Sequence, residues 1–220
     1  MRELVDAAVS ILSLVMLMTA LRITTERRLD RAAKIYALQS FMLVLIFLVM
    51  GIFVDHLFLV WSLSGFITKT ILVPYILLWA LRRIGVKYDA KPLVPVTLEW
   101  VLAGLSIGLS FALAAGIVAG SMGVLIPLAV SLSLFLIGLL QILTRRSTVK
   151  QILGLCHFEN SSHLTLAFMA PRLPETVEIG MATDVILLVF FGSILTMMVY
   201  KQFKTLDTSI MTELKEVNGQ

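Results

Sequence analysis

The stretch QILGLCHFENSSHLTLAFMA, residues 151–170, places a carboxylate, an amide and two histidines inside an otherwise apolar segment. Apolar blocks recur along the whole 220-residue chain, which is 59% hydrophobic and 15% charged and has a mean hydropathy of +0.97. Each block has about the twenty residues that a helix needs to cross a bilayer. Strand-like alternation is absent, and the blocks are about twice as long as a barrel strand. The sequence therefore predicts an all-α, polytopic membrane protein.

Seven transmembrane helices are expected, at residues 3–23, 33–54, 57–81, 97–119, 122–144, 150–170 and 178–201. The first helix is expected to stay in the mature protein, because Glu3 and Asp6 offset Arg2 and the apolar segment is too long for a signal peptide. Glu99 lies near the start of the fourth span, and we expect solvent to reach it there.

Lysine and arginine are distributed very unevenly between the two sides of the predicted membrane. One side holds fifteen of the eighteen, in residues 22–34, 82–91, 145–150 and the C-terminal tail. The other side holds Arg2 and Arg172. The positive-inside rule predicts an external N-terminus and a cytoplasmic C-terminus. The same rule accounts for most of the net charge of +4, so the basic loops do not by themselves indicate nucleic-acid binding.

Two parts of the chain resemble each other at spacings of 115 to 118 residues. RRLDRAAKIYALQSFMLVLIF at 27–47 parallels RRSTVKQILGLCHFENSSHLTLAF at 145–168, and FITKTILV at 66–73 parallels MATDVILL at 181–188. We expect two parallel three-helix repeats joined by one extra helix, which lets the second copy enter the membrane from the same side. The expected units are the N-terminal repeat 1–84, a linker with the fourth span 85–121, the C-terminal repeat 122–205 and a tail 206–220.

Three residues with charged side chains fall well inside the predicted spans, away from the span ends, namely Lys69, Glu159 and Asp184. Each costs about 2.5 to 3.5 kcal/mol at a helix centre on insertion scales, so exposure to lipid by chance is disfavoured. Lys69 and Glu159 lie near the middle of their spans, and Asp184 lies deeper if the last helix begins at Glu175 than if it begins at Glu178. These three residues are the first candidates for a functional site.

Four polar residues of the quoted stretch share one helix face, because they follow the spacing i, i+3, i+4, i+7: Cys156, Glu159, Asn160 and His163. His157 points toward the opposite side of the helix. Glu159 and His163, four residues apart, can share a proton. As an open alternative to a role in proton transfer, these buried polar residues only hold neighbouring helices together. A metal site of Cys156, His157, Glu159 and His163 is less favoured, because structural sites usually draw ligands from several elements. The single cysteine excludes an intrachain disulfide.

Three C-terminal stretches carry a resemblance to a known family: the stretch at 145–168, PETVEIGMATDVILLVFF at 174–191 and TLDTSIMTELK at 205–215. They are similar to the K subunit of complex I and to the C subunit of multisubunit Na⁺/H⁺ antiporters. The whole chain, with ENSSH at 159–163 and EIGMATD at 178–184, resembles more closely component E of hydrogenase-4. That family comprises membrane subunits of formate hydrogenlyase-type energy-converting hydrogenases.

The resemblance implies a non-redox subunit of a bacterial or archaeal cytoplasmic membrane complex that couples electron transfer to proton movement. The K subunit carries a membrane-embedded glutamate on each of its last two helices; the first aligns with Cys156, one turn before Glu159, and the second aligns with Asp184. The resemblance therefore implies that Glu159 and Asp184 carry protons. Lys69 would bias their charge, and His163 or His157 would relay protons.

No motif in the chain binds an iron-sulfur cluster, nickel, a nucleotide or a quinone. The resemblance therefore implies that a nickel-iron centre and iron-sulfur clusters lie in partner subunits. Those partners would include antiporter-like large subunits and a complex I-like membrane anchor subunit. Three other functions stay open: a subunit of a Na⁺/H⁺ antiporter, a purely structural scaffold of the membrane arm, and an independent transporter, for which only Pro74 and Pro127 indicate broken helices.

Overall fold

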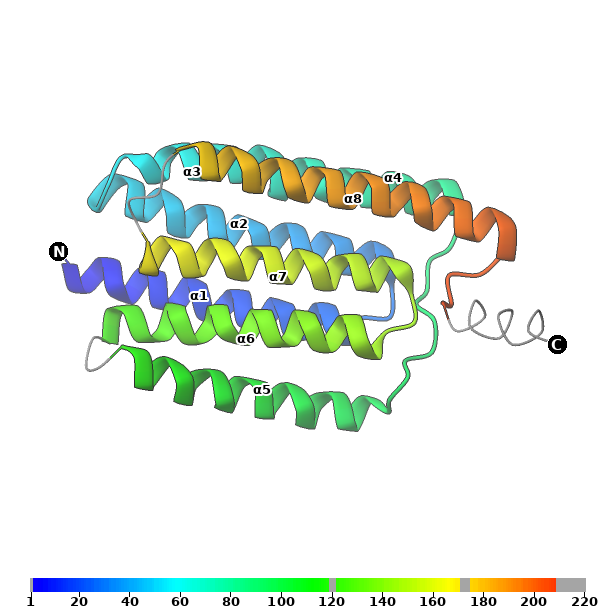
Figure 1. Cartoon of the computed structure of the whole chain (residues 1–220), viewed down its shortest axis with the longest axis horizontal. Helices are drawn as coiled ribbons and strands as arrows, with labels where there is room; N and C mark the ends of the chain where they lie inside the picture. Colours follow the sequence, from blue (N-terminus) through cyan, green and yellow to red (C-terminus); the bar gives the residue numbers. More distant parts are fainter. Residues whose placement is uncertain (1, 119–121, 171–174, 209–220) are drawn as a thin grey trace.

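Long helices running side by side make up the computed structural model, which describes residues 2–118, 122–170 and 175–208 (Figure 1). They are α1 (Arg2–Thr25), α2 (Leu29–Phe53), α3 (Leu57–Gly65), the π-helix η1 (Phe66–Leu72), α4 (Val73–Ile84), α5 (Val96–Ile117), α6 (Met122–Thr144), α7 (Thr148–Met169) and α8 (Glu175–Phe203). Strands are absent from these residue ranges. The predicted all-α class is confirmed. Arg172 and the tail beyond residue 208 lie outside the described residues.

Six segments are long and apolar enough to cross a membrane: Glu3–Thr25, Leu29–Phe53, Leu57–Ile84, Val96–Ile117, Gly123–Thr144 and Thr183–Phe203. The third segment is one continuous rod made of α3, η1 and α4. These segments match predicted spans with small shifts at their ends. Helix α2 begins at Leu29 rather than at residue 33, because the Leu29 backbone N–H donates to the Lys87 carbonyl and fixes the start of the helix.

The sixth predicted span, at 150–170, corresponds to α7, which is of spanning length but too polar to stand among these six segments. Its 22 residues reach about 33 Å. Protein rather than lipid covers its polar side chains, since Cys156, His157, Asn160, Ser161 and His163 are all buried. A polar helix of spanning length is compatible with a bilayer when its polar face is turned into the bundle.

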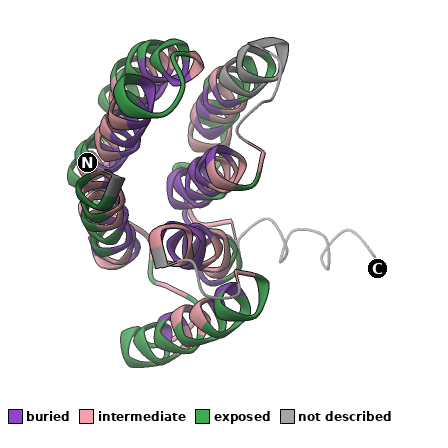
Figure 2. Cartoon of the chain, turned by 90° about the vertical axis from the view of Figure 1, so that its left-hand side faces the viewer, coloured by how far each residue is buried: buried purple, intermediate pink, exposed green. Residues whose placement is uncertain are grey.

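The helices are arranged with α1, α2, α6 and α7 in the middle of the bundle (Figure 1). Helix α5 packs on α6 at one edge, and α8 packs on α4 and α7 at the other. Figure 2, which looks along the helices, shows buried residues on the sides that face other helices and exposed residues around the rim. The largest buried side chains include Trp61, Tyr36, Phe47 and Phe58. The loops 26–28, 85–95 and 145–147, which carry six of the eighteen basic residues, lie at one end of the bundle, here called the basic end.

Helices α6 and α7 approach each other at two glycines. A Cβ atom added to Gly138 would lie 2.7 Å from the Gly154 carbonyl oxygen, and one added to Gly154 would lie 2.8 Å from the Gly138 carbonyl oxygen. Both obstacles are backbone atoms, which cannot move aside as a side chain can. This close contact, typical of small residues between membrane helices, fixes how deep α7 sits in the bundle.

Two backbone features recur 119 residues apart. One is an antiparallel bridge at the basic end, formed once by Arg28 with Tyr88 and again by Ser147 with Asp207. The other is the residue with positive φ after α4 and after α8, which is Gly85 (φ 78°) in the first case and Lys204 (φ 57°) in the second. These matches support the expected duplication, whose unit boundaries stay a prediction.

Candidate functional site

Lys69 lies inside the bundle and forms an ion pair with Glu159. It belongs to η1, in the middle of the rod Leu57–Ile84, and Glu159 lies in the middle of α7. The Lys69 Nζ atom is 2.6 Å from Glu159 Oε2, and the two side chains are 2% and 15% exposed. Short π-helical turns inside α-helices are rare and occur frequently at functional sites. The π-helical turn therefore lies at the point where the two charges meet.

His163 and Asn160 complete this cluster around Lys69. Lys69 Nζ donates to Asn160 Oδ1 at 3.2 Å and lies 2.8 Å from His163 Nδ1. His163 Nδ1 is in turn 3.1 Å from Glu159 Oε1. The polar face predicted from the spacing of Glu159, Asn160 and His163 is thus turned toward Lys69. We call Lys69, Glu159, Asn160 and His163 the central cluster.

The central cluster has two possible hydrogen-bond arrangements. In one, His163 Nδ1 carries no proton and accepts a hydrogen bond from the Lys69 ammonium group. In the other, Nδ1 carries a proton and donates a hydrogen bond to Glu159, whose backbone carbonyl oxygen and carboxylate Oε1 atom both lie 3.1 Å away. Because a single ring nitrogen cannot do both at once, the two arrangements differ in the position of one proton. A group of this kind can take up and pass on a proton without moving its backbone.

Aromatic side chains form a wall beside His163. The Phe47 ring centroid lies 6.3 Å from that of His163, and the Trp61 centroid lies 6.4 Å away. Phe47 is 1% exposed and Trp61 is fully buried. Such apolar surroundings lower the local dielectric constant and strengthen the attraction between Lys69 and Glu159. They also hold the imidazole ring in position.

His157 is buried next to α2, and its Nδ1 atom lies 2.9 Å from Gln39 Oε1. Gln39 Nε2 donates to the Met16 carbonyl of α1 at 3.2 Å. Asn160 Nδ2 approaches Ser40 Oγ at 3.4 Å, which adds a second polar contact between α7 and α2. His157 therefore faces away from Glu159, as its position in the sequence predicted, and joins α7 to α2 and α1.

Asp184 is not part of the central cluster. Helix α8 begins at Glu175, the earlier of the two expected starts, so Asp184 lies nine residues along it, about 14 Å. Its side chain is exposed in a groove of about 730 Å³ between α7 and α8, which Gln151 and Phe191 also line. Within the described part of the chain Asp184 forms no ion pair. The two predicted acids are therefore not brought together.

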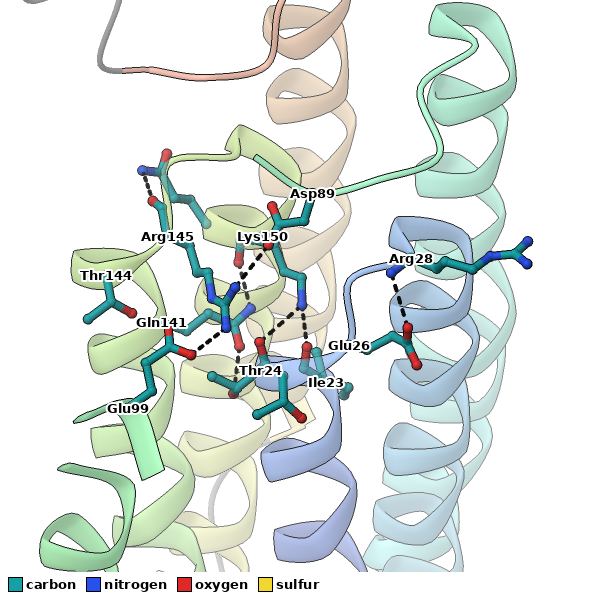
Figure 3. A network of polar contacts seen from close by, with 12 residues as sticks. Ile23, Thr24, Glu26, Arg28, Asp89, Glu99, Gln141, Thr144, Arg145 and Lys150 are labelled. Carbon is teal, nitrogen blue, oxygen red and sulfur yellow. Dashed lines mark hydrogen bonds and ion pairs between the residues drawn. The ribbon is translucent and has the colours of Figure 1, made fainter. Parts of the chain in front are cut away.

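Arg145 joins two carboxylates at the basic end (Figure 3). Its Nη1 atom is 3.1 Å from Asp89 Oδ2, and its Nη2 atom is 2.5 Å from Glu99 Oε2. All three side chains are at most 3% exposed. The prediction that solvent reaches Glu99 is wrong, because the guanidinium group and α6 cover it. Burial raises the pKa of Asp89, and the nearby Lys150 and Arg145 act in the opposite direction.

Lys150 lies beside this group and fastens α7 to α1 (Figure 3). Its Nζ atom donates to the Ile23 carbonyl and, at 3.3 Å, to the Thr24 carbonyl. These carbonyls belong to the last turn of α1, where a positive charge also interacts favourably with the helix dipole. Gln141 Nε2 of α6 donates to the Lys150 carbonyl at 2.7 Å, so α6 is also joined to α7 at this point.

Sequence reasoning missed the network at the basic end, because it assigned Arg145 and Lys150 to the charge asymmetry between loops. The presence of Asp89 and Glu99 on the same side of the predicted membrane was the available signal. It indicated that some of the cations there had partners.

Cys156 is buried and unoxidised, as a small apolar residue would be. Among the described residues there is no group of three or more His, Cys, Asp or Glu side chains that could hold a metal ion.

Comparison with known proteins gives two matches. Residues 126–216 match the family model described as NADH-ubiquinone/plastoquinone oxidoreductase chain 4L. Proteins named hydrogenase-4 component E, from Escherichia coli K12, Escherichia coli O157:H7 and Shigella flexneri, are each 38% identical to this chain over 202 residues. That alignment covers 91% of this chain and 94% of each relative. No solved structure matches at a significant level.

Proposed function

Because the chain belongs to the hydrogenase-4 component E family, we propose that it contributes buried charged residues to proton translocation as a membrane subunit of a hydrogenase complex. The proposal includes a complex I-like architecture of the formate hydrogenlyase type, in which electron transfer drives the protons. The observation that carries it is the ion pair of Lys69 with Glu159, which is buried in mid-membrane and shares a histidine. A charge at that depth is costly unless it has a partner or a function.

Glu159 is the proton carrier in this proposal. A proton on its carboxylate removes the attraction to Lys69, and the same proton can pass to His163 Nδ1 at 3.1 Å. Two unit charges about 4 Å apart interact by about 4 kcal/mol at an effective dielectric constant of about 20. A charge arriving next to Lys69 thus changes the affinity of Glu159 for its proton strongly. Lys69 acts as the fixed positive charge that transmits this change.

His157 would extend the path of protons toward α2, since it contacts Gln39 rather than Glu159. Water molecules would bridge the gaps that side chains leave. The redox centres belong to partner subunits in this proposal, because one cysteine is too few to ligate an iron-sulfur cluster. The chain itself would hold and move protons only.

The α7–α8 groove is the part of this proposal that concerns partners. Asp184 is exposed there at membrane depth, and lipid is a costly environment for a carboxylate. We place a transmembrane helix of another subunit over this groove, with a basic or hydrogen-bonding side chain facing Asp184. Antiporter-like large subunits and a complex I-like anchor subunit are the candidates.

Cross-linking mass spectrometry of the detergent-extracted complex tests this assignment. We expect the subunits of a nickel-iron hydrogenase to co-purify with the chain. Cross-links from residues near Asp184 should lead to one of its large membrane subunits. Co-purification of antiporter subunits alone would instead assign the chain to a Na⁺/H⁺ antiporter, whose C subunit resembles residues 145–215. Recovery of the chain without partners would contradict both assignments.

The positive charge of the basic end orients the chain in the proposal. With fifteen basic residues on that side, a reporter fused after Gln220 should be cytoplasmic and one inserted at Pro171 should be external. Single cysteines can be introduced at these two positions in a Cys156→Ser background. Their accessibility to a membrane-impermeant thiol reagent gives an independent measurement. Labelling of both positions from the cytoplasmic side would contradict the seven-span topology.

A further inference from the structure

A cavity of about 370 Å³ opens at the basic end, between the start of α2 and the end of α4. Four cations line it, namely Arg28, Lys34, Arg82 and Lys87, together with the carboxylate of Asp30. Asp30 is already paired, since its Oδ2 atom lies 3.0 Å from Arg28 Nη2. Across the described residues no ion pair involves the other three cations. The cavity therefore contains three positive charges without a counterion from the protein.

The backbone holds the rim of this cavity in place. Gly85 ends α4 with a φ of 78°, which turns the chain back toward α2. The Leu29 N–H then donates to the Lys87 carbonyl at 3.0 Å, and the Asp89 N–H donates to the Arg27 carbonyl at 2.8 Å. These contacts fix the loop that carries Lys87 against the start of α2. The backbone at the rim of the cavity is therefore fixed, and the exposed side chains of Lys34, Arg82 and Lys87 extend from it.

The other part of the cavity wall is apolar. Leu78, Leu81 and Val86 line it, and Tyr75 and Trp79 are exposed on α4, near the start of the helix and next to Leu78. Lys34 lies five residues after the start of α2, about 8 Å into the helix. The cations thus lie at the level where the polar part of a bilayer meets its hydrocarbon part. A ligand suited to this wall is anionic at one end and apolar at the other.

We propose that this cavity binds the phosphate headgroup of an anionic phospholipid, with the acyl chains along the exposed face of α4. Basic pockets between transmembrane helices recognise such headgroups, and arginine binds phosphate oxygens through two parallel hydrogen bonds. The positive-inside bias explains cations at this end, such as Arg31 and Lys91, that do not line the cavity. It does not explain why four cations converge on one concave surface beside apolar residues.

A titration of the purified chain tests the proposal without any substitution. Native mass spectrometry in a mild detergent would compare phosphatidylglycerol, phosphatidylcholine and inorganic phosphate as ligands. We expect phosphatidylglycerol to bind about tenfold or more tightly than phosphatidylcholine. Inorganic phosphate should compete only weakly, because it lacks the apolar part. Equal binding of the two lipids would overturn the proposal, and so would full competition by phosphate, which would indicate a soluble anion as the ligand.

Matched variants then locate the site. The double variant Lys34→Gln, Arg82→Gln removes two cations of the cavity, and we expect it to weaken phosphatidylglycerol binding about twentyfold. The control Arg31→Gln, Lys91→Gln removes two exposed cations from the same end of the bundle without touching the cavity. The affinity of this control for phosphatidylglycerol should stay within about threefold of the affinity of the original chain. An equal loss in both variants would show that overall charge, not this cavity, attracts the lipid.

Discussion

Replacement of Glu159 by glutamine should lower proton translocation by the assembled complex about tenfold or more, while hydrogenase activity with an artificial electron acceptor stays nearly unchanged. Glutamine keeps the size and the hydrogen-bonding capacity of the side chain but cannot carry the proton. Redox chemistry should continue, because the proposed function places the redox centres in partner subunits. Acidification of inverted membrane vesicles, normalised to the amount of assembled complex, measures proton translocation. Hydrogen oxidation with a dye as electron acceptor measures hydrogenase activity.

Glu3→Gln is the matched control, since it makes the same chemical change at an exposed position at the start of α1. It should leave both activities as they are. Glu159→Asp keeps a titrating group and should retain part of the proton translocation. Asp184→Asn is expected to behave like Glu159→Gln. Unchanged translocation in the double variant Glu159→Gln, Asp184→Asn would reject the proton relay.

Helix positions and membrane depth were predictable from the sequence because both depend on local information. A run of apolar residues fixes the length of a span, and counting residues placed Lys69 and Glu159 at similar depth. The i, i+3, i+4, i+7 spacing also placed Asn160 and His163 on the face of Glu159, and that face meets Lys69 in the structure. These predictions needed no knowledge of which helices are neighbours.

Contacts between distant helices were not predictable in the same way. Arg145 reaches Asp89 and Glu99 across 56 and 46 residues of chain, and nothing in hydropathy identifies such a pairing. The close approach of Gly138 to Gly154 depends on the relative shift of two helices, which a single sequence does not fix. The π-helical turn around Lys69 also changes the direction of later side chains relative to a regular α-helix. Each of these features is decided by packing.

Asp184 shows that a sequence can single out a candidate residue and still leave the environment of that residue unknown. Its position inside an apolar segment identified it as a functional candidate, and its exposure in the groove only became visible with α7 and α8 in place. Its counterpart is therefore expected on another subunit. A sequence-based account of one chain has no access to that contact.

Removal of Lys69 alone should destabilise the chain more than removal of both charges of the Lys69–Glu159 pair. Lys69→Met leaves a carboxylate in the bundle without its cation, a loss that costs about 3 to 5 kcal/mol for buried pairs. Glu159→Gln should cost less, because Lys69 keeps Asn160 and His163 as partners. In the double variant Lys69→Met, Glu159→Gln no charge is left unpaired. Its destabilisation should therefore be smaller than the sum of the two single effects, with a coupling of about 2 kcal/mol.

The same double variant decides between a tether and a relay. Denaturation in detergent gives the three free energies of unfolding, and native gel electrophoresis gives the fraction of assembled complex. If the pair only holds helices together, the double variant should recover assembly and proton translocation together. If Glu159 carries the proton, the double variant should assemble well and still fail to translocate, because stability returns while the titrating group does not. Additive effects on stability would show that the 2.6 Å contact contributes no coupling energy, contrary to the argument from burial.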